Sequence, residues 1–213
     1  MKLYGRTTSF NVQKVLWLLD ELGLTYELVE LGGRFGGLET EDFQQLNPMK
    51  KVPVLIDGER LIWESHTILR YLVLEYSPQT WGKGSPYSRS LYERWMDWSQ
   101  VTFQPAFMAT FWGYYRMPPD KRDMNTVESN LVRCKQCLEQ IEAQLKETDY
   151  LAGSSMSLAD ICVGAVLYRL TTQGLSISLS ANTQRWFDEL CIRPGYATWV
   201  MADYSELKGR EGF

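Results

Sequence analysis

The segment NPMKKVPVLIDGERLIWES, residues 47–65, carries the patterns that decide the fold. Asp57-Gly58 separates two apolar runs, VPVLI and RLIW, and Asp-Gly between such runs is a strong signal for a two-residue hairpin. Pro53 has no N–H to donate to a neighbouring strand, and the beginning of a strand is one of the few places where a sheet tolerates it. The segment therefore predicts an antiparallel hairpin with a proline at the start of its first strand.

The rest of the first half alternates between strand and helix patterns. Short apolar or alternating runs predict strands at 2–4 and 25–31. Apolar residues that recur at intervals of three and four predict helices at 10–23, 40–47 and 64–76. Together with the hairpin, the order is β-α-β-α-β-β-α, which is a parallel crossover followed by an antiparallel pair on one mixed sheet. We expect a domain of class α/β over residues 1–78.

Beyond a linker the sequence predicts only helices. Residues 77–88 are rich in Gly, Pro and Ser, which favours a linker. Ser157 and Asp160 have the spacing of a capping box at the start of a helix. The predicted helices cover 87–115, 125–147, 158–172, 182–191 and 196–204. The second domain, residues 87–213, is therefore expected to be all-α.

Composition argues against several classes of protein. The chain has 213 residues, of which 45% are hydrophobic, and this content is typical of a globular protein. The net charge of -4 and the lack of a Lys/Arg cluster argue against a nucleic-acid partner. The sequence shows neither a signal-peptide pattern nor an apolar stretch long enough for a membrane span. We expect a cytoplasmic protein with no membrane partner.

The cysteines and the single histidine restrict metal and nucleophile chemistry. Cys134 and Cys137 have CxxC spacing, which would suit a redox pair or half of a metal site. Their helix also carries leucines at spacings of three and four, so the alternative is that Cys134 is a small apolar core residue. His66 is the only histidine, which excludes an HExxH site and argues against a Ser-His-Asp hydrolase. We expect no metal.

Four stretches together resemble the cytosolic glutathione S-transferases, in particular bacterial members that use serine or asparagine. Each stretch is weak alone, but they occur in order, with matching spacing, over the whole chain. They are Ser9-Phe10-Asn11-Val12-Gln13-Lys14-Val15, Asn47-Pro48 with Lys51-Val52-Pro53-Val54-Leu55, Glu64-Ser65 with Ile68 and Tyr71-Leu72, and Ser157-Leu158-Ala159-Asp160. The resemblance implies a thioredoxin-like first domain that binds glutathione as co-substrate, a helical second domain and a homodimer.

The resemblance also implies how the tripeptide is held. A cis Val52-Pro53 bond would leave the main chain of Val52 free to pair with glutathione as an added strand would. The alternative is a trans proline at the first residue of a strand. Ser65, at a helix start, would hold the γ-glutamyl carboxylate, and Glu64 its α-amino group. Alternatively, Ser65 is only an N-cap and Glu64 a surface charge. Lys51 would reach the glycyl carboxylate or would simply be solvated.

The chemistry requires the sulfur of glutathione as a thiolate, whereas a free thiol with a pKa near 8.5 is largely protonated at neutral pH. Ser9, where the first helix begins, can donate a hydrogen bond to that sulfur, and the helix N-terminus adds positive potential. Asn11 offers an amide donor at the same place. Thr7, Thr8 and Tyr4 are competing hydroxyl groups. We expect Ser9 and Asn11 to be the catalytic residues.

The electrophile is expected to lie between the two domains. Five side chains are candidates for an apolar pocket: Phe10, Phe111, Trp112, Tyr115 and Arg116. The alternative is that the aromatic residues form core, as they more often do at helical spacing. Arg116 would attract an anionic substrate, or is simply an exposed arginine, which is the default.

The predicted activity is attack of glutathione on an electrophilic small molecule. Two alternatives stay open. One is a glutathione-dependent disulfide reductase or peroxidase, and the other is a non-catalytic binding or assembly module with the same fold. No cysteine precedes Cys134, which argues against a mixed disulfide on an enzyme thiol in the first domain.

Overall fold

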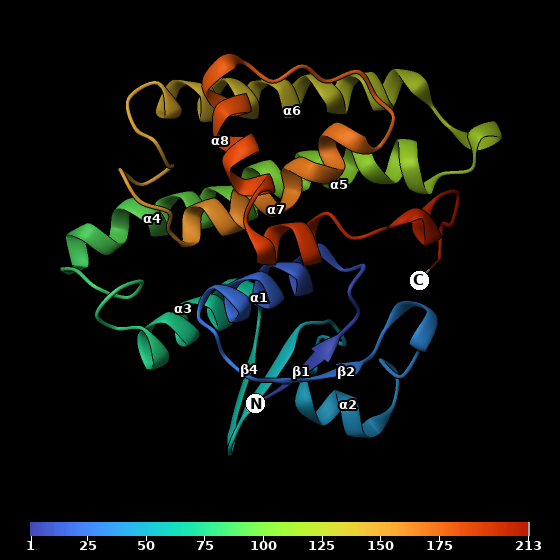
Figure 1. Cartoon of the computed structure of the whole chain (residues 1–213). Helices are drawn as coiled ribbons and strands as arrows, with labels where there is room; N and C mark the ends of the chain where they lie inside the picture. The colour runs from blue at the N-terminus through green and yellow to red at the C-terminus, as the bar shows by residue number, and fades with distance from the viewer. Residues whose placement is uncertain (213) are drawn as a thin grey trace. The chain divides into compact units, whose positions relative to one another are not determined.

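The computed structural model describes residues 1–212 and divides into two compact units (Figure 1). The first unit consists of residues 1–83 and 194–202, and the second of residues 84–193 and 203–212. The linker predicted from the sequence spans the division between residues 83 and 84. The segment 194–202, which the sequence placed in the second domain, instead packs within the first unit. No helix in residues 1–212 has the length and apolar character needed to cross a membrane.

A four-stranded sheet organises the first unit. Its strands are β1 (Lys2–Gly5), β2 (Glu27–Glu30), β3 (Val54–Asp57) and β4 (Arg60–Trp63), in the order β2-β1-β3-β4. β1 is parallel to β2 and antiparallel to β3, which pairs antiparallel with β4. The helices are α1 (Phe10–Glu21), α2 (Glu41–Leu46) and α3 (Ser65–Tyr76), with a 3₁₀ turn η1 (Gly33–Phe35). α1 and α3 lie on one side of the strands and α2 on the other (Figure 1). The predicted β-α-β-α-β-β-α order is confirmed.

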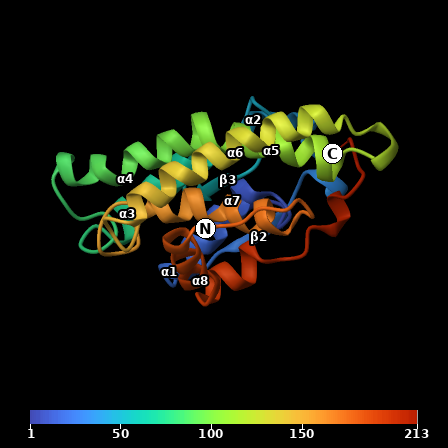
Figure 2. The same cartoon turned by 90° about the horizontal axis from the view of Figure 1, so that it is seen from above.

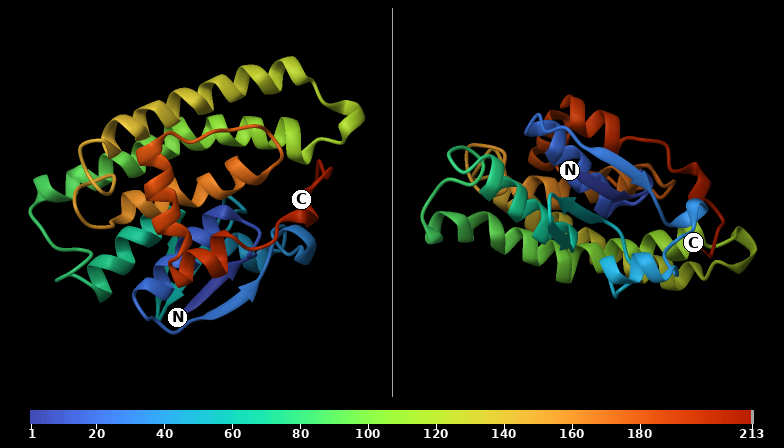
Figure 3. Two further views of the ribbon diagram at one scale, coloured as in Figure 1. Left: turned by 45° about the horizontal axis from the view of Figure 1, so that its top comes forward. Right: turned by 90° about the horizontal axis from the view of Figure 1, so that it is seen from below.

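Helix α1 is covered on more than one face. Every side chain from residue 12 to residue 19 is buried. One cover is α3, and another is the π-helical turn η5 (Tyr196–Val200), which lies beside α1 in Figure 3. The rings of Trp17 and Tyr196 meet edge to face at 4.8 Å, and Trp199 Nε1 donates to Asp20 Oδ2 at 2.7 Å. This segment, distant in sequence, therefore completes the core of the first unit.

The second unit consists of helices. α4 (Pro86–Trp98), the π-helical turn η2 (Ser99–Phe103), α5 (Gln104–Phe111) and the π-helical turn η3 (Trp112–Arg116) follow one another without a break. α6 (Met124–Leu145) runs alongside α5 (Figure 2). The remaining elements are η4 (Pro119–Lys121), α7 (Leu158–Thr172), α8 (Ala181–Cys191) and η6 (Ser205–Leu207). The predicted helix at 196–204 was too long, since only the turn at 196–200 is helical.

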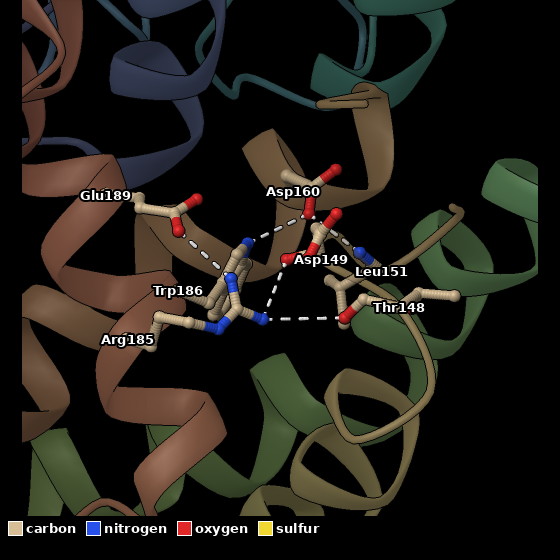
Figure 4. A network of polar contacts seen from close by, with 7 residues as sticks. All are labelled: Thr148, Asp149, Leu151, Asp160, Arg185, Trp186 and Glu189. Atoms are coloured by element: carbon tan, nitrogen blue, oxygen red, sulfur yellow. Dashed lines mark hydrogen bonds and ion pairs between the residues drawn. The ribbon is translucent and has the colours of Figure 1, made fainter. Parts of the chain in front are cut away.

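Asp160 joins three parts of the second unit (Figure 4). Its Oδ1 accepts from Leu151 N and from Trp186 Nε1, both at 3.0 Å. Its Oδ2 accepts from the main chain and the hydroxyl of Ser157, at 2.8 and 3.0 Å, which completes the predicted capping box. Burial raises the pKa of Asp160 to about 6, while the four donors favour the charged form. At neutral pH this carboxylate therefore ties α8 and the loop at Leu151 to the start of α7.

The two cysteines of the CxxC pattern belong to the core face of α6. Cys134 and Cys137 are both buried, and burial raises the pKa of each thiol, to about 11 for Cys137. Thr110 Oγ1 lies 3.4 Å from Cys134 Sγ. No group of three or more His, Cys, Asp or Glu side chains within residues 1–212 is arranged to hold a metal ion. These surroundings favour the core interpretation of the cysteines over the redox one.

Candidate functional site

Residues from four stretches of the sequence meet at one small pocket in the first unit. The lining residues are Asn11, Asn47, Lys51, Val52, Pro53, Glu64 and Ser65. Six of these seven were predicted from the sequence, and they lie at the start of α1, in the loop before β3 and at the start of α3. Asn47 also lines the pocket but was not predicted as a site residue.

The main chain at Val52 lies just outside the sheet. The Val52–Pro53 peptide bond is cis, so the alternative of a trans proline is wrong. The ladder of β3 begins one residue after the proline, where Val54 pairs with Tyr4 of β1 and with Trp63 of β4. Because Val52 precedes this ladder and lines the pocket, its peptide groups can pair with an extended ligand.

Asn47 shapes the loop that leads to Val52. Its side chain is buried, its Nδ2 donates to Lys51 O at 2.8 Å, and its Oδ1 accepts from Met49 N at 3.0 Å. A side-chain amide that bonds both ends of a short loop holds the loop in one conformation. In the sequence Asn47 appears only within one of the four stretches that carry the resemblance, and no sequence pattern indicates its hydrogen bond to Lys51 O.

Glu64 and Ser65 mark the junction of β4 and α3. Glu64 stands at the N-cap position with φ 70° and ψ 117°, a backbone conformation that residues other than glycine rarely adopt. Ser65 is the first residue of the helix and is buried, so the alternative that Ser65 is the N-cap is wrong. The strained backbone directs this pair of residues into the pocket at the positive end of a twelve-residue helix.

Ser9 and Asn11 stand at the beginning of α1. Ser9 is the N-cap, but its side chain makes no capping hydrogen bond, which leaves the hydroxyl available to a ligand. Asn11 Oδ1 accepts from the ammonium of Lys14 at 3.0 Å and from Ser65 Oγ at 3.4 Å. Asn11 thereby connects the start of α1 with the start of α3.

Lys14 and His66 are buried side chains next to the place where the starts of α1 and α3 meet. Lys14 is fully buried, and its Nζ lies 3.1 Å from Nε2 of His66. Burial, followed by the charges of Lys14 and Arg70, lowers the pKa of His66 to about 2. The imidazole is therefore neutral at physiological pH. Sequence patterns did not single out Lys14, because a lysine on a helix is usually solvated.

The aromatic candidates are distributed over the two units. Phe10 belongs to the first unit, where the ammonium of Lys14 lies 5.3 Å from its ring centroid. In the second unit Phe111 stacks on Tyr115 at 5.1 Å, and both rings pack against Tyr204. Phe111 and Tyr115 are buried in this cluster.

The other two candidates differ in exposure. Trp112 is 37% exposed and offers ring surface to solvent. The expectation that Arg116 is exposed by default was wrong, because the side chain is only 4% exposed. Its guanidinium lies over the ring of Trp112 at 4.1 Å, and its Nε donates to Arg210 O at 2.7 Å. A substrate anion at Arg116 would therefore have to share a guanidinium that already holds the C-terminal segment.

Comparison with known proteins agrees with both halves of the fold. Residues 1–73 match the glutathione S-transferase N-terminal domain family, and residues 103–194 match the glutathione S-transferase C-terminal domain family. Glutathione S-transferase GstB of Escherichia coli is 35% identical, over 95% of this chain and 99% of its own length. The probable glutathione S-transferase GSTF2 of Oryza sativa is 31% identical, over 91% and 93%.

A solved structure resembles the whole chain. The theta class glutathione S-transferase from Xanthomonas axonopodis pv. citri, with glutathione bound, superimposes with a TM-score of 0.90 and is 36% identical, covering 95% of this chain and 97% of that one. Transferase F2 from Populus trichocarpa, at 23% identity and a TM-score of 0.84, shares the fold. On these grounds, together with the thioredoxin-like sheet and the helical second unit, the chain belongs to the cytosolic glutathione S-transferase family.

Proposed function

We propose that this protein binds glutathione in the pocket beside Val52 and activates its thiol for attack on an electrophilic small molecule. One observation carries the proposal. Six residues that the sequence assigned to glutathione from three separate stretches line a single pocket: Asn11, Lys51, Val52, Pro53, Glu64 and Ser65.

Each part of the tripeptide has a partner of suitable chemistry. The peptide groups of Val52 pair with the cysteinyl residue as a neighbouring strand would. The carboxylate of Glu64 pairs with the α-amino group. The hydroxyl of Ser65, which donates to Asn11 Oδ1 in this structure, turns to the γ-glutamyl carboxylate, where the dipole of α3 favours negative charge. Lys51 reaches the glycyl carboxylate at the other end.

The chemical step is a nucleophilic substitution or addition by sulfur. The thiol proton leaves to solvent, the sulfur lone pair forms a bond to the electrophilic carbon, and a leaving group departs with its electron pair where one is present. Ser9 and Asn11 act as hydrogen-bond donors to the thiolate and not as bases. One such bond to a charged acceptor contributes roughly 1.5–3 kcal/mol, which lowers the thiol pKa by about one to two units.

Of the five side chains proposed from the sequence for the second substrate, the partly exposed ring of Trp112 is available to a ligand, whereas Phe10, Phe111, Tyr115 and Arg116 are buried. The family resemblance further supports a cytoplasmic homodimer that acts in detoxification without a metal. A disulfide reductase or peroxidase that uses two glutathione molecules is the second candidate within the same chemistry.

Calorimetry followed by three assays tests the proposal. Titration with glutathione should give heat at millimolar or lower concentration, and conjugation to an aryl halide should then proceed faster than without enzyme. Turnover of a peroxide or a mixed disulfide, without aryl halide conjugation, would favour the reductase. Binding without any turnover would favour the non-catalytic module, and no binding would refute the proposal.

Replacing Glu64 with glycine should separate stability from binding. Glycine adopts a positive φ without strain, so the free energy of unfolding should stay the same or rise by about 1 kcal/mol. Loss of the carboxylate removes a charge-assisted hydrogen bond, and the affinity for glutathione should fall about tenfold or more. Urea unfolding and calorimetry measure the two effects.

Lys50 provides the matched control. Its φ is 54°, so Lys50→Gly relieves a similar backbone conformation, yet Lys50 does not line the pocket. The affinity for glutathione should be unchanged in this variant. Equal loss of affinity in both variants would mean that the loop backbone, and not the carboxylate of Glu64, governs binding.

A further inference from the structure

The buried ammonium of Lys14 is placed to control the amide of Asn11. Residues three apart lie on the same face of an α-helix, and Lys14 follows Asn11 by that interval in α1. Lysine is almost never fully buried without partners. Here Nζ donates to Asn11 Oδ1 at 3.0 Å and lies 3.1 Å from His66 Nε2.

The chemistry of these groups fixes their orientation. An ammonium group has only donors, so the atom of Asn11 that faces it must be the oxygen. For the same reason Nε2 of His66 must be the acceptor, which places the ring proton on Nδ1. The lowered pKa of His66 keeps the ring neutral, so it accepts from Lys14 throughout the physiological pH range.

The nitrogen of the Asn11 amide is then left for a ligand. Oδ1 accepts from Lys14, which remains its donor when the Ser65 hydroxyl turns to a bound carboxylate, and among residues 1–212 no acceptor pairs with Nδ2. Asn11 also lines the pocket beside Val52 and Pro53. A cation bonded to the carbonyl end of an amide draws electron density from it, and this makes the N–H groups stronger donors.

We propose that Lys14 is a positioning residue, which holds the amide of Asn11 with Nδ2 facing the bound tripeptide and strengthens its hydrogen bond to the thiolate. The inference rests on the proposed function, because it requires glutathione in the pocket. It extends that function by assigning a role to a residue with no direct contact to the ligand. His66 completes the arrangement as the neutral acceptor that holds the other side of the ammonium.

The thiol pKa of enzyme-bound glutathione, followed by the ultraviolet absorbance of the thiolate, tests the role of Lys14. Lys14→Met should raise this pKa by about one unit, which leaves about tenfold less thiolate at pH values well below it. Lys14→Gln keeps a neutral donor and should recover part of the loss. kcat should fall more than the affinity for glutathione, since the interaction strengthens with charge on sulfur.

A double-mutant cycle distinguishes positioning from a direct effect of charge. In the Asn11→Ala background, Lys14→Met should change the thiol pKa little, because the group through which Lys14 acts is absent. An effect as large as in the native background would overturn the proposal. Arg70→Met is the matched control, as it removes the other cation that lowers the pKa of His66, and it should leave the thiol pKa unchanged.

The native protein supplies a test that does not depend on folding of the variants. The side-chain amide resonances of Asn11 should shift when ¹⁵N-labelled protein is titrated with glutathione. They should shift much less with the analogue in which a methyl group replaces the thiol. Equal shifts would overturn the proposal. Failure of the native protein to bind glutathione would refute the proposed function, whereas binding with an unchanged thiol pKa in folded Lys14 variants would refute this inference alone.

Discussion

Asp160→Ala is expected to lower the free energy of unfolding by about 3–5 kcal/mol. The substitution removes the acceptor of four hydrogen bonds, and two of the donors, Leu151 N and Trp186 Nε1, belong to fully buried residues. A buried donor left without a partner costs about 1–3 kcal/mol, and loss of the capping box adds about 1 kcal/mol. Urea unfolding followed by circular dichroism measures the change, and tryptophan fluorescence should report the altered surroundings of Trp186.

Two variants make this measurement specific. Asp160→Asn keeps one acceptor oxygen in the same place and should lose less stability than Asp160→Ala. Asp149, a nearby exposed carboxylate in the region shown in Figure 4, provides the control. Asp149→Ala should change the free energy of unfolding by no more than about 0.5 kcal/mol. A loss below 1 kcal/mol for Asp160→Ala would show that water replaces the lost acceptor.

Ser9→Ala is expected to lower turnover at pH 7 by about tenfold or more, because one charge-assisted hydrogen bond to the thiolate is lost. Stability should change little, since the side chain of Ser9 makes no capping hydrogen bond in this structure. A loss of turnover without a loss of stability would show that the Ser9 hydroxyl binds the ligand and does not cap the helix.

The pH dependence of turnover shows whether this loss of activity results from a raised thiol pKa. A hydrogen bond that stabilises the thiolate lowers the thiol pKa, so its removal raises that pKa and moves the rising limb of the profile to higher pH. The deficit should therefore be largest below the native thiol pKa and should shrink above the pKa of the variant. Thr7→Val, an isosteric loss of a nearby hydroxyl, should leave the profile unchanged. A deficit of the same size at every pH would assign Ser9 a role other than thiolate stabilisation.

The strands and helices of residues 1–83 could be predicted from the sequence because their signals are local, whereas the contribution of residues 194–202 to the same unit could not. Asp57-Gly58 identifies the hairpin, and β3 and β4 end and begin at the residues that this turn requires. Apolar residues at intervals of three and four predicted the ends of α1 and α3 to within one or two residues. The residues predicted to bind glutathione could be proposed because the family pattern fixes them by spacing. Lys51, Val52, Pro53, Glu64 and Ser65 line one pocket, whereas Ser9 is not among its lining residues.

The features missed by sequence reasoning depend on contacts between distant residues. Lys14 reads as a surface charge on α1, and only the packing of α3, which brings His66 to it, makes it a buried cation. Arg116 was likewise expected to be exposed, because its contacts with Trp112 and with the distant Arg210 O cannot be seen in the sequence. The predicted helix at 87–115 is continuous but contains the π-helical turns η2 and η3, which the sequence did not indicate.

The contact between Trp17 and Tyr196 has a consequence for synthesis on the ribosome. The glutathione-binding half begins at the first residue, yet the side chains that cover one face of α1 arrive more than 170 residues later, as the separation of Trp199 from Asp20 illustrates. A nascent chain that ends at Lys83 contains the complete sheet but lacks Tyr196, whose ring packs edge to face against the indole of Trp17. Any attempt to express this half alone must therefore carry a graft of residues 194–202, or supply another cover for that ring.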